Sequence, residues 1–130
     1  MRHAVETGLP PIDTPLEWVV TADGIFYTAL VAVKPGGGIE TGDIRAQTTQ
    51  TLENLKHCLA AAGGTMDDVT QILIYLTDGR DVKAMNEIYA QYFHKPYPNR
   101  ATVVVSALVV PGCIVEMVVH AHIGSNSPKP

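Results

Sequence analysis

Two charged side chains stand out because they interrupt apolar, strand-like stretches of the sequence: Arg100 and Glu116. Arg100 follows two prolines in the stretch 96–108, which reads PYPNRATVVVSAL. A guanidinium group presents a planar fork of N–H donors that matches a carboxylate or phosphate with two parallel hydrogen bonds. An arginine at a strand end can also simply extend into water. The sequence therefore leaves two interpretations of Arg100 open, an anion-binding group and a solvated strand end.

Glu116 is the only carboxylate in the apolar run CIVEMVVHAHI. Burying an unpaired carboxylate is costly, so Glu116 needs an ion-pair partner such as Arg100, water at a sheet margin, or a role in proton transfer. Arg100 lies sixteen positions earlier, with a turn at Pro111-Gly112 between the two residues. A tight hairpin through that turn does not set them directly opposite each other. A site that uses both residues therefore forms diagonally or across subunits.

Other reactive residue types are present without a convincing catalytic pattern. His120 and His122 form a His-x-His pair that could supply two metal ligands, but no third ligand has a suggestive spacing, so we expect no metal. No serine has a glycine-flanked turn and a His/Asp partner, which argues against a serine nucleophile. Cys58 falls within a helical pattern and is expected to pack, while Cys113 follows a turn and is expected to be exposed.

Composition limits the class of protein. The 130 residues suit one domain, 1–130, with an irregular arm at about 1–14 and a frayed tail at about 124–130. Only 17% of residues are charged and 46% are hydrophobic, which is typical of a small domain that hides apolar surface in an oligomer. The net charge of −4 and the absence of a Lys/Arg run disfavour nucleic acid and membrane as partners. With no apolar leader and no motif spacing of the two cysteines, we expect a cytoplasmic protein.

The apolar periodicity predicts the order β-β-α-β-α-β-β. Two β-rich runs within EWVVTADGIFYTALVAV are broken by a hairpin signal at 22–24, and a helical stripe follows, from about Thr41 to Ala62. The remaining expected elements are a strand within 66–78, a helix at about 81–93, and strands at 100–109 and 113–123. This order favours an α+β fold with both helices on one face of a mixed sheet. Another subunit is then expected to cover the second face.

Taken together, these segments resemble the RidA (YjgF) family of reactive-intermediate deaminases. The stretch PNRATVVVSALVVPGCIVEMVVHAHIG resembles the carboxy-terminal signature of that family: Pro-x-Arg, a strand, a proline turn and an apolar strand with one Glu. Three further segments are similar to other parts of the family. ADGIFYTAL resembles the strand that usually ends in Ser-Gly, QTTQTLENLKHCLAAAGG resembles the first helix, and MNEIYAQYF resembles the second helix. The GGTMDDVT and AHIG segments look especially like the RutC-type branch, which is associated with aminoacrylate in pyrimidine degradation.

The resemblance implies a chorismate-mutase-like fold and a homotrimer with a barrel-like core and clefts between subunits. It also implies hydrolysis of enamines or imines to 2-oxo acids and ammonia, without metal or organic cofactor. By the same resemblance, Arg100 clamps the substrate carboxylate, with help from the backbone at Thr102. Glu116 positions or activates water and relays protons, Thr28 takes the place of the usual serine, and Asn86 lies at or near the cleft.

Three departures from the family pattern suggest an altered pocket. Leu16 replaces a common aromatic, Thr28-Ala29 replaces Ser-Gly, and one extra residue separates Arg100 from Glu116. The main expectation is a deaminase of small carboxylated enamines or imines. The alternatives are a pathway-specific deaminase, acting on an aminomuconate-like or aminoacrylate-like intermediate, and a non-catalytic trimeric carboxylate-binding or regulatory module. The acidic balance disfavours the ribonuclease activity that the family's name sometimes carries.

Overall fold

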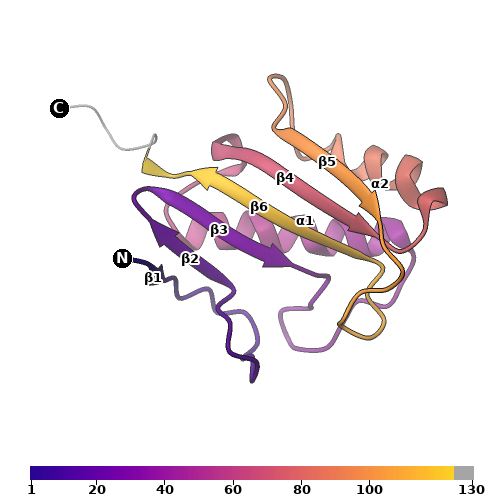
Figure 1. The fold of residues 1–130 in the computed structure, drawn as a ribbon, viewed down its shortest axis with the longest axis horizontal. Coiled ribbons are helices and arrows are strands. Elements are labelled where there is room, and N and C mark those ends of the chain that lie inside the picture. The colour runs from indigo at the N-terminus through magenta and orange to yellow at the C-terminus, as the bar shows by residue number, and fades with distance from the viewer. Residues whose placement is uncertain (125–130) are drawn as a thin grey trace.

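A computed structural model describes residues 1–124 of the chain, so the expected frayed tail lies outside the described residues except for Gly124. Two helices pack behind one mixed sheet (Figure 1). The sheet has the strand order β1-β2-β3-β6-β4-β5, in which only the pair β4 and β5 is parallel. The elements are β1 His3–Ala4, β2 Val19–Ala22, β3 Ile25–Leu30, α1 Ile44–Ala61, β4 Val69–Leu76, α2 Val82–Tyr89, β5 Asn99–Val104 and β6 Val115–His122. The α+β class and the layering expected from the sequence are confirmed.

The predicted hairpin forms between β2 and β3. Asp23 and Gly24 both adopt positive φ angles, of 51° and 79°, as a two-residue turn between twisted strands requires. A β-carbon at Gly24 would lie 3.4 Å from the backbone of Gly124, which donates to the Gly24 carbonyl. The expected irregular arm contains one short strand, β1, because Ala4 pairs with Val20 of β2.

Helix α1 is the main element behind the sheet. The Asp43 side chain caps its first turn by accepting from the Ala46 N–H at 3.0 Å. The whole predicted apolar stripe is buried: Ile44, Thr48, Leu52, Leu55 and Leu59. Asn54, also buried, donates to the carbonyls of Val31 and Val33, which ties α1 to the chain that leaves β3.

Two elements are shorter than the sequence predicts. Helix α2 ends at Tyr89 rather than near Phe93, because Gln91 and Tyr92 donate to carbonyls only three residues earlier and the coil tightens into turns. Strand β5 ends at Val104 rather than at 109. Its single neighbour β4 ends at Leu76, the residue paired with Val104, so the chain beyond has little strand left to pair with.

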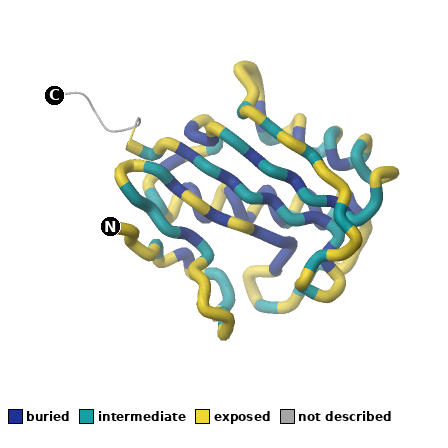
Figure 2. The backbone as a smooth tube through the Cα atoms, in the orientation of Figure 1, coloured by how far each residue is buried: buried dark blue, intermediate teal, exposed yellow. Residues whose placement is uncertain are grey.

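Buried and less buried residues alternate along the central strands (Figure 2), because the two faces of the sheet differ in burial. On the helix-covered face Phe26, Ile72, Ile74, Met117 and Val119 are at most 1% exposed. The opposite face carries mainly apolar side chains without a covering layer, among them Tyr27 (37% exposed), Ala29, Leu73, Tyr75, Val103 (44% exposed) and Val118. No helix within residues 1–124 is long and apolar enough to cross a bilayer.

Candidate functional site

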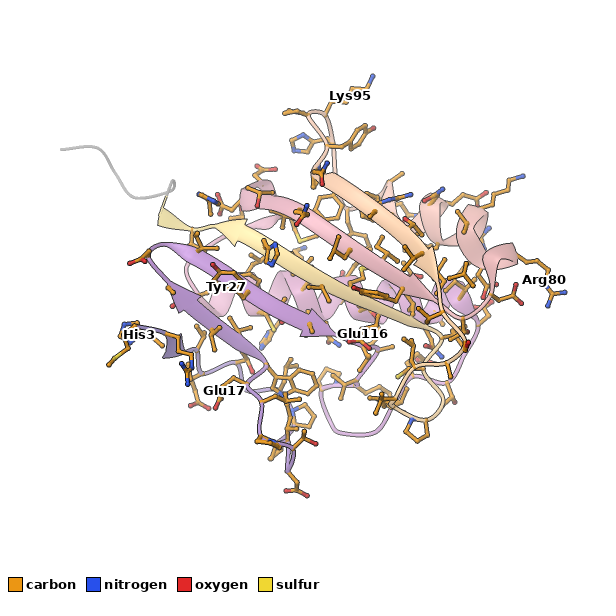
Figure 3. The ribbon with its side chains drawn as sticks, viewed as in Figure 1. His3, Glu17, Tyr27, Arg80, Lys95 and Glu116 are labelled. Carbon is orange, nitrogen blue, oxygen red and sulfur yellow. The ribbon has the colours of Figure 1, made fainter. Side chains whose placement is uncertain are left out.

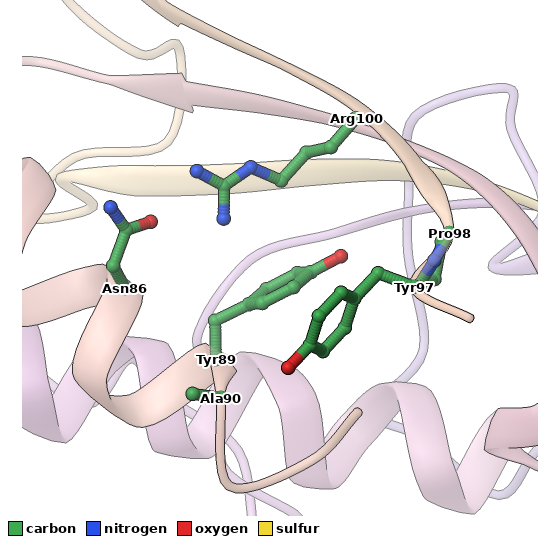
Figure 4. Close-up of a pocket in the computed structure, with 6 residues that line it drawn as sticks. All are labelled: Asn86, Tyr89, Ala90, Tyr97, Pro98 and Arg100. Atoms are coloured by element: carbon green, nitrogen blue, oxygen red, sulfur yellow. The ribbon is translucent and has the colours of Figure 1, made fainter. Parts of the chain in front are cut away.

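Arg100 lies in a cavity between the sheet edge and helix α2. The cavity has a volume of about 280 Å³ and is lined by Asn86, Tyr89, Ala90, Tyr97, Pro98 and Arg100 (Figure 4). Arg100 pairs in register with Ile72, a fully buried residue of β4, so its side chain starts on the helix-covered face of the sheet. Because β5 is the edge strand, this side chain reaches a cavity rather than a sealed core.

The guanidinium group of Arg100 lies over the aromatic ring of Tyr89, with Cζ 4.8 Å from the ring centroid (Figure 4). Burial raises the pKa of the Tyr89 hydroxyl, and the positive charge of Arg100 partly opposes that rise. No carboxylate among residues 1–124 forms an ion pair with Arg100. The expected alternative of an Arg100–Glu116 pair within one chain is therefore wrong.

Buried polar atoms without partners gather around this arginine. Three buried atoms have no hydrogen-bond partner among the described residues: Asn86 Oδ1, Tyr89 OH and Thr102 Oγ1. Only one other buried side-chain atom in residues 1–124, in α1, also lacks a hydrogen-bond partner. Thr102 follows Arg100 by two positions on the same strand face. Buried polar atoms in native proteins are almost always satisfied, so such a group beside an unpaired cation fits a polar ligand or water.

Glu116 lies in a second cavity, of about 380 Å³. Its neighbours along β6, Val115 and Met117, are buried on the helix-covered face, so Glu116 points to the open face (Figure 3). Burial raises the pKa of the Glu116 carboxyl group. A carboxyl group with a raised pKa in an apolar recess suits proton transfer near neutral pH.

The structure distributes the remaining candidates unevenly. Leu16 and Ala29 line the Glu116 cavity, together with Trp18 and Val110. Thr28 is buried on the other face of β3, where its hydroxyl donates to the Trp18 carbonyl at 2.5 Å. Asn86 lines the Arg100 cavity, and Thr102 lies beside it.

Within one chain Arg100 and Glu116 do not share a cavity. β4 lies between their strands, and their side chains project from opposite faces of the sheet. The sequence left two arrangements of a shared site open, diagonal and across subunits, and this geometry favours the one across subunits.

The other reactive residues are not assembled into a site. His120 contacts the Tyr27 ring edge-on and lies 3.3 Å from Gln71 Oε1, and residues 1–124 contain no group of three ligands suited to a metal. Both cysteines are free thiols and buried, so the expected exposure of Cys113 is wrong. Its pKa is raised by burial, and that of Cys58 is raised to about 12 for the same reason.

Sequence reasoning assigned no site role to Tyr89 or Tyr97. The sequence nevertheless contains a sign of each role. Tyr89 follows Asn86 by three positions, which places both on one helix face, and Tyr97 stands between the two prolines that precede Arg100.

Comparison with known proteins places this chain in a family. Residues 11–123 match the family model described as Endoribonuclease L-PSP. The chain is 38% identical over 118 residues to the 3-aminoacrylate deaminase RutC of Acinetobacter baylyi, covering 89% of this chain and 93% of that protein. It is also 38% identical over 104 residues to a RutC family protein of Pyrococcus horikoshii, covering 79% and 82%.

Solved structures agree. The Rid family protein YyfA of Yersinia pestis superposes with a TM-score of 0.88 at 33% identity, covering 94% of this chain and 99% of that one. Escherichia coli TdcF with bound serine gives a TM-score of 0.84 at 28% identity, covering 92% and 98%. The chain belongs to the Endoribonuclease L-PSP family, the RidA (YjgF) proteins, and is related to the RutC branch.

Proposed function

We propose that this protein is a cofactor-free hydrolytic deaminase, which converts small carboxylated enamines and imines to 2-oxo acids and ammonia. The active form is a homotrimer, with Arg100 of one copy and Glu116 of a neighbouring copy at each site. The observation that carries the proposal is the unpaired Arg100 in a cavity with three buried, unsatisfied polar atoms beside it. The relation to a named 3-aminoacrylate deaminase supports the substrate class.

The open face of the sheet supports assembly. Its apolar side chains, such as Tyr75, Val103 and Val118, have no covering layer within residues 1–124. A second copy on this face removes that apolar surface from water, and it can bring its own Glu116 cavity toward the Arg100 cavity. One assembly then accounts both for the exposed apolar face and for the separation of the two charged residues.

Arg100 holds the substrate carboxylate through two parallel N–H donors. The backbone at Thr102 adds a further donor. The Val105 N–H donates to Leu76 of β4, so strand alternation directs the Thr102 N–H away from β4, toward the free edge of the sheet. Asn86 Oδ1, an acceptor with no hydrogen-bond partner among residues 1–124, suits an N–H group of the substrate.

The chemistry needs orientation and one proton relay. An enamine first takes a proton on its β-carbon and becomes an iminium ion. The oxygen of water then bonds to the iminium carbon while the C=N π electrons move to nitrogen. The Glu116 carboxylate takes a proton from that water and returns it to nitrogen. The C–N bond breaks, ammonia leaves with the electron pair, and loss of the hydroxyl proton forms the carbonyl group.

Leu16 and Ala29 line the Glu116 cavity with apolar groups. They keep the carboxyl group poorly solvated, which raises its pKa and makes its proton easier to keep and return than that of an exposed glutamate. Thr28 supports the cavity indirectly, because its hydrogen bond to Trp18 fixes the segment that forms one wall.

A comparison of turnover by the wild type and Arg100→Ala tests this function. The substrates are 2-aminoacrylate and 2-iminobutanoate generated in situ, and the rate of 2-oxo acid release is measured against the uncatalysed rate. We expect acceleration by the wild type and its loss in Arg100→Ala. If neither protein accelerates hydrolysis while Arg100-dependent binding of 2-oxobutanoate persists, the protein is a carboxylate-binding module and not a deaminase.

A further inference from the structure

The ring of Tyr89 occupies the space directly beneath the guanidinium group of Arg100 (Figure 4). We propose that Tyr89 is a positioning residue, whose aromatic face fixes the Arg100 fork in the orientation that receives the substrate carboxylate. This inference rests on the proposed role of Arg100 in substrate binding. It assigns to Tyr89 a task carried out by its ring, not by its hydroxyl group.

Arginine needs such support here. Its long side chain has many rotamers, and ordering it for a ligand opposes binding unless something holds it beforehand. Among residues 1–124 no carboxylate holds Arg100, and the other residues around the cavity are uncharged. A cation over an aromatic face is attracted to the ring, and the distance of 4.8 Å from Cζ to the ring centroid falls within the range of that attraction.

The ring itself is fixed in place. Tyr89 is 6% exposed and packs against Phe93, with ring centroids 4.6 Å apart and planes tilted by 34°. Tyr89 is the last residue of α2, and Asn86 precedes it by one helical turn on the side of the same cavity. The helix therefore sets the ring and the amide of Asn86 in one rigid relation to the arginine.

Contact with the ring covers one face of the guanidinium group and leaves its edge N–H donors for a ligand. The Tyr89 hydroxyl is not needed for this support. It has no hydrogen-bond partner among the described residues, so its removal breaks no hydrogen bond within residues 1–124. The ring role and the hydroxyl role can therefore be separated by substitution.

The test compares Tyr89→Leu, Tyr89→Phe and the control Phe26→Leu. Phe26 is a fully buried aromatic residue of the same core, on β3, and it does not line the Arg100 cavity. The dissociation constant of 2-oxobutanoate is measured by calorimetry, and kcat and KM for 2-iminobutanoate are measured well below each melting temperature. We expect Tyr89→Leu to raise the dissociation constant and KM about tenfold with little change in kcat. Tyr89→Phe recovers most of the affinity, and Phe26→Leu stays close to the wild type.

An NMR measurement needs only the folded wild type. A side chain over an aromatic face is shifted upfield by the ring current, so the Arg100 side-chain protons, assigned by their loss in Arg100→Ala, should resonate upfield of those of exposed arginines. Ordinary shifts for Arg100 overturn the proposal even if Tyr89→Leu does not fold. Equal losses of affinity in Tyr89→Phe and Tyr89→Leu, or in Phe26→Leu and Tyr89→Leu, also overturn it.

The outcomes separate this inference from the proposed function. If Arg100→Ala retains full turnover, the proposed site itself is wrong. If Arg100→Ala abolishes turnover while Tyr89→Leu binds 2-oxobutanoate like the wild type, the site stands and only the positioning role of Tyr89 is lost.

Discussion

Arg100 and Glu116 project from opposite faces of the same sheet, on strands β5 and β6 with β4 between them. Arg100 aligns with the buried Ile72, whereas Glu116 aligns with Tyr75 on the open face. Two residues arranged in this way cannot bind one small substrate within a single chain. Their joint use in catalysis therefore requires a second copy of the chain.

Replacing Arg100 by lysine tests whether the fork geometry or the charge alone binds the carboxylate. Lysine keeps the positive charge but loses the pair of parallel donors, so we expect Arg100→Lys to weaken 2-oxobutanoate binding about tenfold. The measurement is a calorimetric titration. The matched control is Arg80→Lys, because Arg80 is exposed, pairs with Asp78 and does not line the cavity, so this change should leave binding unaltered. Equal affinity of Arg100→Lys and the wild type contradicts bidentate recognition.

Glu116→Gln tests the proton relay. The amide can neither accept nor return a proton, so we expect kcat to fall by about 10²- to 10⁴-fold while 2-oxobutanoate binding is largely kept. In the wild type, kcat/KM should rise with pH as the carboxyl group ionises, with an apparent pKa above the usual range for glutamate because burial raises it. The same acidic limb in the Glu116→Gln variant would assign the titration to another group.

Burial of Glu116 also makes stability depend on pH. Its folded-state pKa is raised, so between the unfolded and folded values the native chain holds more protons than the unfolded chain. The contribution of Glu116 to stability therefore falls as pH rises through this window and is neutral below the unfolded value. We expect Glu116→Gln to be more stable than the wild type to urea at pH 7, with the difference vanishing below about pH 4. If the difference in stability between Glu116→Gln and the wild type persists unchanged at low pH, ionisation of the buried Glu116 carboxyl group is not its cause.

Gln47 fixes the start of the strand that carries Glu116. Its buried amide donates to the Gly112 carbonyl at 2.8 Å and accepts from the Ile114 N–H at 3.0 Å. Gln47→Leu leaves two main-chain groups unpaired, so we expect a loss of about 2–4 kcal/mol in the free energy of unfolding, measured by urea titration. Gln91→Leu, on the exposed end of the α2 region, is the control and should change it by less than about 0.5 kcal/mol. Similar losses of unfolding free energy in both variants would contradict the stabilising role assigned to the two hydrogen bonds of Gln47.

Much of the fold was predictable because local signals and burial agree. Asp23-Gly24 specifies the hairpin, and the stripe from Ile44 to Leu59 specifies the helix and its buried face. The ends of α2 and β5 were misjudged, since they depend on where β4 stops and on how the coil tightens after Tyr89. These ends depend on relations between elements, and the local pattern of residues within one segment does not contain those relations.

The site was only partly predictable for the same reason. Strand alternation shows which neighbours share a face with Arg100 or with Glu116 within each strand. It does not show how the faces of the two strands correspond, so it could not predict that the two residues lie on opposite faces of the sheet. The resemblance sets Thr28 at the position of the family's serine, yet its side chain faces the core while Ala29 lines the Glu116 cavity. The aromatic support beneath Arg100 required the actual packing of α2 on β5.

Subunit mixing tests the central claim most directly. Arg100→Ala and Glu116→Gln, each inactive alone, are unfolded together, refolded as an equal mixture and assayed with 2-iminobutanoate. If each site takes Arg100 from one copy and Glu116 from its neighbour, random assembly makes about one quarter of the sites fully native. We therefore predict recovery of about one quarter of wild-type activity in the mixture. Activity no higher than that of either variant alone would contradict a site shared between copies.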